Sequence, residues 1–217
     1  MRPFLFGGAM NVVYFGSKEI KNDFRTAINS LLAHTQANVF AVVEEELDLP
    51  VTNIRWENKW FNDLNTQTKW KSFGCIRPAL TKLFPDIDTI LSLDVDTIVE
   101  QDISELFDID LTGYYFAAVK EPYLSSVKPY FNTGVCLLNL KYLRETGKDE
   151  EMINALNTVR FRYVSQDCMN TFCEGKILEL PPEYNVCKFI PSASCKIRHY
   201  ADEVYWRGLP EVKRWIE

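Results

Sequence analysis

The chain alternates between short apolar runs and amphipathic segments, a pattern typical of proteins in which strands and helices follow one another. Residues 11–15 form the first apolar run and residues 39–43 the second. The segment between them carries apolar residues at helical spacing and begins at Asn22 or Asp23, either of which can cap a helix. A strand, a helix and a strand at this spacing predict a parallel crossover connection.

The remaining elements follow from the same two periodicities. Further strands are predicted at 52–56, at 115–119, 135–140, 177–180 and 196–200, and over the run that ends at Asp94. Helices are predicted over 70–84 with an interruption at Pro78, over 101–107, and in two segments capped by Asp149 and Ser165, the second closed by Gly175. Residues 57–70 have no clear period and predict a loop over one edge of the sheet.

The length of 217 residues and the absence of repeats or low-complexity linkers predict one α/β domain over residues 1–217. Residues 1–9 form either a leader before Met10 or a first strand. The formal charge of −6 argues against a nucleic-acid partner, which would require a basic face. No apolar run approaches the roughly 18 residues of a transmembrane segment.

The six cysteines contain no Cys-x-x-Cys pair, and several lie at apolar-periodic positions. This arrangement favours buried free thiols in a reducing compartment over disulfides or zinc ligands. We therefore expect a cytoplasmic protein, which would mean the host cytoplasm if the source is viral.

Two aspartates, Asp94 and Asp96, follow the apolar run 89–93. If that run is a buried strand, both side chains project from its carboxyl end, where open α/β sheets bind ligands. Carboxylates held this close repel each other unless a cation lies between them, and their hard oxygens suit Mg²⁺ or Mn²⁺. Two further Asp-x-Asp sequences, at 86–88 and 108–110, occur in turn-like contexts and are interpreted as solvated acids.

Several short motifs occur in a fixed order along the chain. They are Arg77-Pro78-Ala79-Leu80, Asp94-Val95-Asp96, Tyr130-Phe131-Asn132-Thr133-Gly134-Val135, Ser165-Gln166-Asp167 and Arg198-His199-Tyr200. In this order and spacing the sequence resembles the family 8 glycosyltransferases, which include glycogenin and bacterial lipooligosaccharide galactosyltransferases. The resemblance implies a GT-A fold, with a Rossmann-like, mixed and mostly parallel sheet flanked by helices. It also implies a UDP-sugar donor bound through Mn²⁺ or Mg²⁺ and a glycan or glycoprotein acceptor.

The resemblance further implies roles for individual residues. Asp94, Asp96 and His199 match the metal ligands. The catalytic positions correspond to Arg77 near the diphosphate, Gln166 facing the anomeric centre and Asp167 facing the sugar. The remaining substrate-binding positions correspond to Phe15, Gly16, Ser17, Asn132 and Thr133.

The sequence departs from the family pattern at three positions. Ser165 stands where the family usually has an acid, Asp202 replaces a glycine, and Tyr205 replaces a lysine that would contact the leaving diphosphate. Arg207, two residues beyond Tyr205, is the predicted substitute for that lysine and is assigned to the substrate-binding set; Lys213 and Lys18 are alternatives.

Each motif also has a purely structural interpretation. Ser165 and Asp167 suit a helix N-terminus, residues 132–134 could form a hairpin turn, and His199 could be a core histidine. Arg77 could pair with Asp86 or Asp88 on the surface. Trp70 and Trp215 are predicted to lie in the core.

Two other functions compete with the glycosyltransferase interpretation. Asp94-Val95-Asp96-Thr97 resembles the strand end of haloacid-dehalogenase-type phosphatases, in which the first aspartate is the nucleophile. The missing lysine and acid instead suggest a non-catalytic module that binds a nucleotide sugar. Release of phosphate from an aryl phosphate would indicate the former, and UDP binding without hydrolysis the latter.

Overall fold

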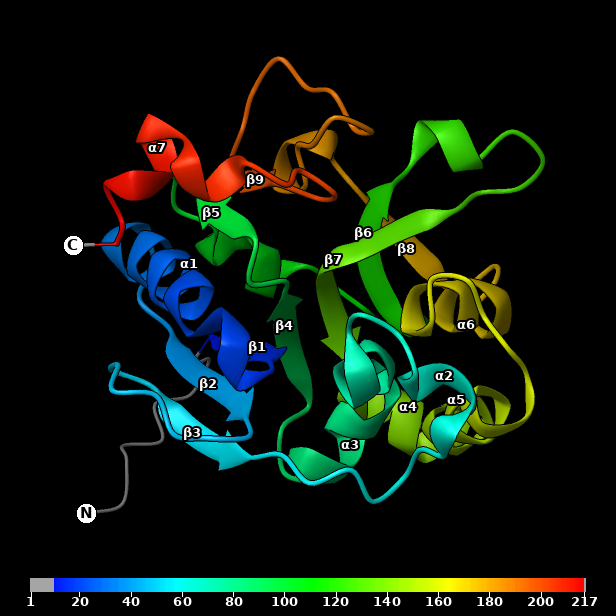
Figure 1. Ribbon diagram of the computed structural model, residues 1–217. Coiled ribbons are helices and arrows are strands. Elements are labelled where there is room, and N and C mark those ends of the chain that lie inside the picture. The colour runs from blue at the N-terminus through cyan, green and yellow to red at the C-terminus, as the bar shows by residue number, and fades with distance from the viewer. Residues whose placement is uncertain (1–9, 217) are drawn as a thin grey trace.

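The computed structural model describes residues 10–216. Residues 1–9, predicted as a leader or first strand, lie outside the described part. The architecture consists of one seven-stranded sheet with helices on both faces and a smaller two-stranded sheet beside it (Figure 1). This confirms the predicted α/β fold with a mixed, mostly parallel sheet.

The main sheet has the strand order β3-β2-β1-β4-β7-β6-β8. Its strands are β1 (Asn11–Gly16), β2 (Asn38–Val43), β3 (Thr52–Arg55), β4 (Thr89–Leu93), β6 (Phe116–Lys120), β7 (Phe131–Asn139) and β8 (Ile177–Leu180). Strand β7 runs antiparallel to β4 and β6, whereas the other neighbours pair in parallel. The predicted parallel crossover through the first helix is confirmed by the β1–β2 pairing.

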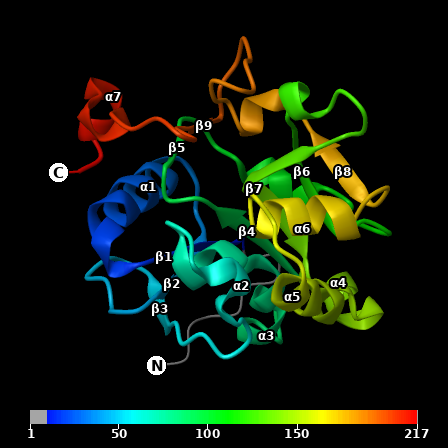
Figure 2. The same cartoon turned by 45° about the vertical axis from the view of Figure 1, so that its right-hand side comes forward.

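Helices cover both faces of this sheet. They are α1 (Lys21–His34), α2 (Asp63–Thr66), α3 (Leu80–Leu83), α4 (Leu140–Thr146), α5 (Lys148–Thr158), α6 (Ser165–Phe172) and α7 (Pro210–Lys213). Alternate residues of β1 face opposite sides: Val12 and Tyr14 belong to the core under α1, and Val13 and Phe15 to the core under α3–α6. Figure 2 shows α1 on one side of β1 and β4 and helices α3–α6 on the other. Burial on both faces explains why the strands read as continuous apolar runs.

The small sheet pairs β5 (Thr97–Val99) with β9 (Ile197–His199) in antiparallel register. The strand predicted at 196–200 therefore exists, but it lies outside the main sheet. Strand β5 follows β4 after only three residues, so this pairing brings the end of the chain to the carboxyl end of β4. Residue His199 lies opposite Thr97.

The structure does not form the helix predicted over 70–84. The segment forms 3-10 turns over 71–75 and 77–79 before the short α3. Pro78 has no N–H to donate to the carbonyl of Gly74, and Lys71 has a φ of 52°, so a continuous helix is excluded. Helix α2 lies within residues 57–70, where a loop was predicted.

Smaller differences concern helix ends. Residues 104–108 form a 3-10 helix in place of the one predicted over 101–107. Asp149 and Ser165 lie inside the first turns of α5 and α6 and are not the caps; Gly147 and Val164 occupy the cap positions. Helix α6 ends at Phe172, before Gly175. Buried Asp149 instead accepts a hydrogen bond from Thr81 Oγ1 at 2.7 Å.

The six cysteines are free thiols, and all except Cys195 are buried, as predicted. Among residues 10–216 no helix has the length and apolarity to cross a membrane.

Candidate metal and substrate site

Two adjoining cavities, of about 400 Å³ and 630 Å³, open at the carboxyl ends of β1 and β4. Asp94 and Asp96 line both cavities, as do Gln166 and Arg207. The first cavity is bounded by the end of β1, and the second by the segments that surround β9 and by the β6–β7 connection. The acidic pair therefore lies where the two cavities meet.

The acidic pair lies in the turn between β4 and β5, because β4 ends at Leu93. The turn is held by the Asp94 N–H, which donates to Gly134 O at 2.8 Å, and by Thr97 Oγ1, which donates to Asp94 O at 2.7 Å. A turn, and not strand pleating, brings the two carboxylates together.

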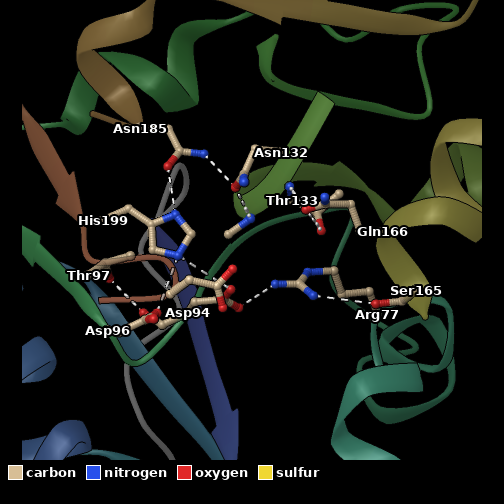
Figure 3. A network of polar contacts seen from close by, with 12 residues as sticks. Arg77, Asp94, Asp96, Thr97, Asn132, Thr133, Ser165, Gln166, Asn185 and His199 are labelled. Carbon is tan, nitrogen blue, oxygen red and sulfur yellow. Dashed lines mark hydrogen bonds and ion pairs between the residues drawn. The ribbon is translucent and has the colours of Figure 1, made fainter. Parts of the chain in front are cut away.

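His199 completes a three-residue cluster with the two acids (Figure 3). Its Nε2 lies 3.3 Å from Asp96 Oδ1 and 3.8 Å from Asp94 Oδ2. One potential ligand atom of each residue lies within 4.8 Å of the others. Two carboxylates and one imidazole form a donor set that fits Mn²⁺, and Mg²⁺ less well because of the nitrogen.

The charges in this cluster are tightly coupled. Burial opposes ionisation of both the His199 ring and the Asp96 carboxylate. The neighbouring carboxylates outweigh this effect and raise the pKa of His199, while His199 lowers the pKa of Asp96. The imidazole and the carboxylates therefore each favour the charged form of the other.

Arg77 is a buried cation beside the acidic pair. Its guanidinium NH2 lies 2.5 Å from Asp94 Oδ1, NH1 donates to Ser165 Oγ at 3.4 Å, and the group stacks over Phe15 with 5.0 Å from Cζ to the ring centroid. Its side chain is only 7% exposed. The alternative that Arg77 pairs with surface acids is therefore wrong.

Gln166 and Thr133 meet on the wall of the first cavity. The Thr133 N–H donates to Gln166 Oε1 at 3.0 Å, and Gln166 Nε2 donates to the Tyr130 hydroxyl at 3.1 Å. Asp167 lies behind them, outside the residues that line the cavities. It accepts hydrogen bonds from the Tyr130 hydroxyl at 2.5 Å and from the Tyr163 N–H at 2.8 Å.

The end of strand β1 and a residue from the C-terminal part of the chain, Arg207, both line the first cavity. Phe15, Gly16 and Ser17 line it at the end of β1. Arg207 also lines this cavity and donates from Nε and NH2 to the buried Asp23 carboxylate at 2.7 and 2.5 Å. Tyr205, at the position of the family's lysine, is 86% exposed.

Asn132 lies within β7, so the predicted hairpin-turn alternative is wrong. Its side chain lines the second cavity and is part of a buried hydrogen-bond chain that includes Asn185 and Glu121. Neither Asn185 nor Glu121 was singled out from the sequence, since neither belongs to a recognisable motif.

Sequence reasoning also missed the rim that both cavities share. Trp70 is 43% exposed on this rim, so its predicted place in the core is wrong. Lys69 forms an ion pair with Asp202 at 3.3 Å and so joins two segments that are distant in sequence. Asp202 has a φ of 57°, which explains why the family's glycine can be replaced by an aspartate, a residue that tolerates this conformation.

Comparison with known proteins agrees with this fold. The sequence profile of glycosyl transferase family 8 matches residues 11–204. A comparison with curated protein sequences gives no significant match.

Solved structures of glycosyltransferases share the fold. The bifunctional glycosyltransferase WbbM superimposes with a TM-score of 0.75 at 22% identity, over 100% of this chain and 50% of WbbM. The galactosyltransferase LgtC, solved with donor and acceptor sugar analogs, gives 0.76 at 16% identity, over 95% of each chain. Mouse xyloside xylosyltransferase 1 gives 0.68 at 18% identity, over 89% of this chain and 98% of the mouse protein. This chain thus spans half the length of WbbM but nearly all of LgtC.

The mixed sheet and its flanking helices form a GT-A-like fold, which the chain shares with LgtC. The chain belongs to glycosyl transferase family 8, a family of enzymes. The predicted family and fold class are confirmed. The alternative interpretation as a phosphatase is wrong, because the chain belongs to a glycosyltransferase family.

Proposed function

We propose that this chain is a single-domain, metal-dependent transferase that moves a sugar from a UDP-sugar to a hydroxyl group of a glycan or glycoprotein. The observation that carries the proposal is the position of Asp94, Asp96 and His199. They form one cluster at the junction of two cavities. A donor and an acceptor must meet at such a junction for a sugar to pass between them.

Asp94, Asp96 and His199 would hold Mn²⁺, or alternatively Mg²⁺. When bound, the ion neutralises negative charge on the departing diphosphate as a Lewis acid. Arg77 forms an ion pair with Asp94, and its planar guanidinium can donate hydrogen bonds to a phosphate oxygen bound beside Asp94. Arg207 supplies a second cation on the wall of the same cavity.

The first cavity suits the nucleotide and the second suits the acceptor. Phe15 and Phe73 line only the first, and Trp70 and Trp206 line both, so the first cavity offers aromatic side chains that favour stacking with a base. The second is lined by the polar Glu121 and Asn132 and by the aromatic Tyr123 and Phe189, which together suit a sugar ring.

Gln166 lines both cavities and can donate and accept hydrogen bonds to the sugar that is transferred. Thr133 orients it through the bond to Gln166 Oε1. Asp167 acts here by fixing Tyr130, which in turn holds the Gln166 amide. We assign Asp167 to the support of the donor site.

The five buried free cysteines fit a reducing compartment such as the cytoplasm. The formal charge of −6 disfavours a nucleic-acid partner, which would require a basic face.

A donor screen tests the proposal. UDP- and GDP-linked sugars are incubated with the protein and Mn²⁺, and the released nucleoside diphosphate is measured with and without EDTA. We expect Mn²⁺-dependent release from at least one UDP-sugar. Binding of UDP without release from any donor would instead support a non-catalytic nucleotide-sugar module.

A further inference from the structure

A buried chain of hydrogen-bonding side chains extends from His199 away from the acidic pair (Figure 3). His199 Nδ1 lies 2.9 Å from Asn185 Oδ1, and Asn185 Nδ2 donates to Asn132 Oδ1 at 2.9 Å. Asn132 Nδ2 donates to Glu121 Oε2 at 3.3 Å. Because each link needs one donor and one acceptor, the direction of the chain determines where protons lie.

The direction is fixed at Asn132. The backbone N–H of Gly134 donates to Asn132 Oδ1 at 3.0 Å, and a backbone N–H cannot exchange its role. On the other side of the amide, the Glu121 carboxylate accepts from Nδ2. A flipped Asn132 would place its NH₂ group against an N–H and its oxygen against a carboxylate, so this orientation is excluded.

The orientation of Asn185 follows from that of Asn132. Asn132 Oδ1 is an acceptor, so Asn185 must present its NH₂ group to it. Its own Oδ1 is then left facing His199 Nδ1. Asn185 is fully buried, so a flipped amide would leave its oxygen facing Asn132 Oδ1 with no proton between the two oxygens.

An oxygen that faces His199 Nδ1 requires a proton on that nitrogen. We infer that Asn185 is a positioning residue that holds His199 with Nδ1 protonated and thereby directs the free electron pair of Nε2 toward the metal position between Asp94 and Asp96. The Nε2 atom lies on the acid side of the ring, 3.3 Å from Asp96 Oδ1. This inference rests on the proposed metal-dependent function and adds a supporting residue to it.

Nitrogen NMR reads the proton position directly. The chain has only two histidines, so ¹⁵N-histidine labelling gives two rings, and a His34→Gln variant assigns them. The spectra are recorded at alkaline pH, where the ring is neutral, and again with Mg²⁺. We expect a proton on His199 Nδ1 and an unprotonated Nε2 in both. A proton on Nε2 with a bare Nδ1 would overturn the inference.

Metal affinity provides the second readout. Asn185→Leu keeps the approximate volume but removes the acceptor, and we expect Mn²⁺ affinity to fall about 10- to 100-fold, the usual effect of losing such a partner. Mn²⁺ binding is measured by electron paramagnetic resonance of the free ion. Affinity equal to that of the unmodified protein would contradict the role of Asn185.

Asn65→Leu serves as the matched control. Asn65 is also buried, donates to Leu156 O and Val159 O and accepts from the Phe161 N–H, and lines neither cavity. We expect this variant to lose stability without losing Mn²⁺ affinity; an equal loss of affinity in both variants would reduce Asn185 to a general structural role. If Asn185→Leu does not fold, the spectra of the unmodified protein still decide the question. If the unmodified protein binds no Mn²⁺ although Nδ1 carries the proton, the proposed function fails and the assignment of the ring stands.

Discussion

The His199 ring lies directly against the backbone of Gly134, so that a β-carbon on Gly134 would come within 2.1 Å of ring atom Cε1. Strand β7 thus passes under the ring that completes the Asp-Asp-His cluster. Glycine is required here by space and not by backbone conformation.

Gly134→Ala should therefore displace the His199 ring from the acidic pair. We expect Mn²⁺ affinity to fall at least about 10-fold, an effect comparable to losing a supporting residue of a metal site. Titration calorimetry measures it. Gly208→Ala is the control, because a β-carbon at Gly208 would meet no atom within 4 Å. Equal affinity in the two variants would show that His199 does not ligate the ion.

Asp96→Asn should abolish Mn²⁺-dependent release of UDP from the donor, because it removes one of the two anionic ligands. We expect the protein to remain folded, since the substitution removes one negative charge from a pair of neighbouring carboxylates that repel each other. Asp86→Asn, in an exposed Asp-x-Asp sequence, is the control and should match the unmodified protein. Retained turnover in Asp96→Asn would remove Asp96 from the metal site.

Arg207→Ala should lower kcat by about 100-fold if the guanidinium stabilises the departing diphosphate by about 3 kcal/mol. Mn²⁺ affinity should change little, because Arg207 is not one of the three candidate metal ligands. Arg214→Ala is a matched control: it removes a similarly exposed arginine, bound to Glu100 at 2.7 Å, that lines neither cavity. Unchanged kcat and KM for Arg207→Ala would show that Arg207 does not replace the family's lysine.

Mn²⁺ affinity should rise with pH. The carboxylates of Asp96 and Asp94 raise the pKa of His199 against the opposing effect of burial. Below that raised pKa a proton occupies Nε2 and competes with the ion, and above it the competition ends and affinity levels off. Calorimetry in buffers of different ionisation enthalpy counts the released protons. A His199→Ala variant should lose this proton release; if it is retained, another group carries the competing proton.

The main sheet and the acidic pair could be predicted from the sequence, since both depend on local patterns. Strands buried on both faces read as apolar runs, and Asp94 and Asp96 interrupt the end of one of them. The order in which the motifs occur then indicated the family.

The contacts that assemble the second half of the site could not be predicted, because they join distant segments. The strand at 196–200 was predicted and His199 was assigned to the metal site through the resemblance. Strand β5, however, has only three residues, too few to show a period, and its pairing with β9 brings His199 to Asp96. Asn185, the partner of His199 Nδ1, and Asn132, to which Asn185 donates, are 53 positions apart in sequence. Trp70 lies in a segment without clear period, so its exposure at the cavity rim left no local signal.

Asp94, Asp96 and His199 are proposed to bind a divalent ion that in turn binds a nucleoside diphosphate. Titration of UDP into the protein with Mn²⁺, and again with EDTA, measures this dependence. We predict clear UDP binding with Mn²⁺, a large loss of affinity with EDTA, and the same loss with Mn²⁺ in Asp96→Asn. Equal UDP affinity under all three conditions would show that the nucleotide does not bind through a metal ion held by Asp94, Asp96 and His199.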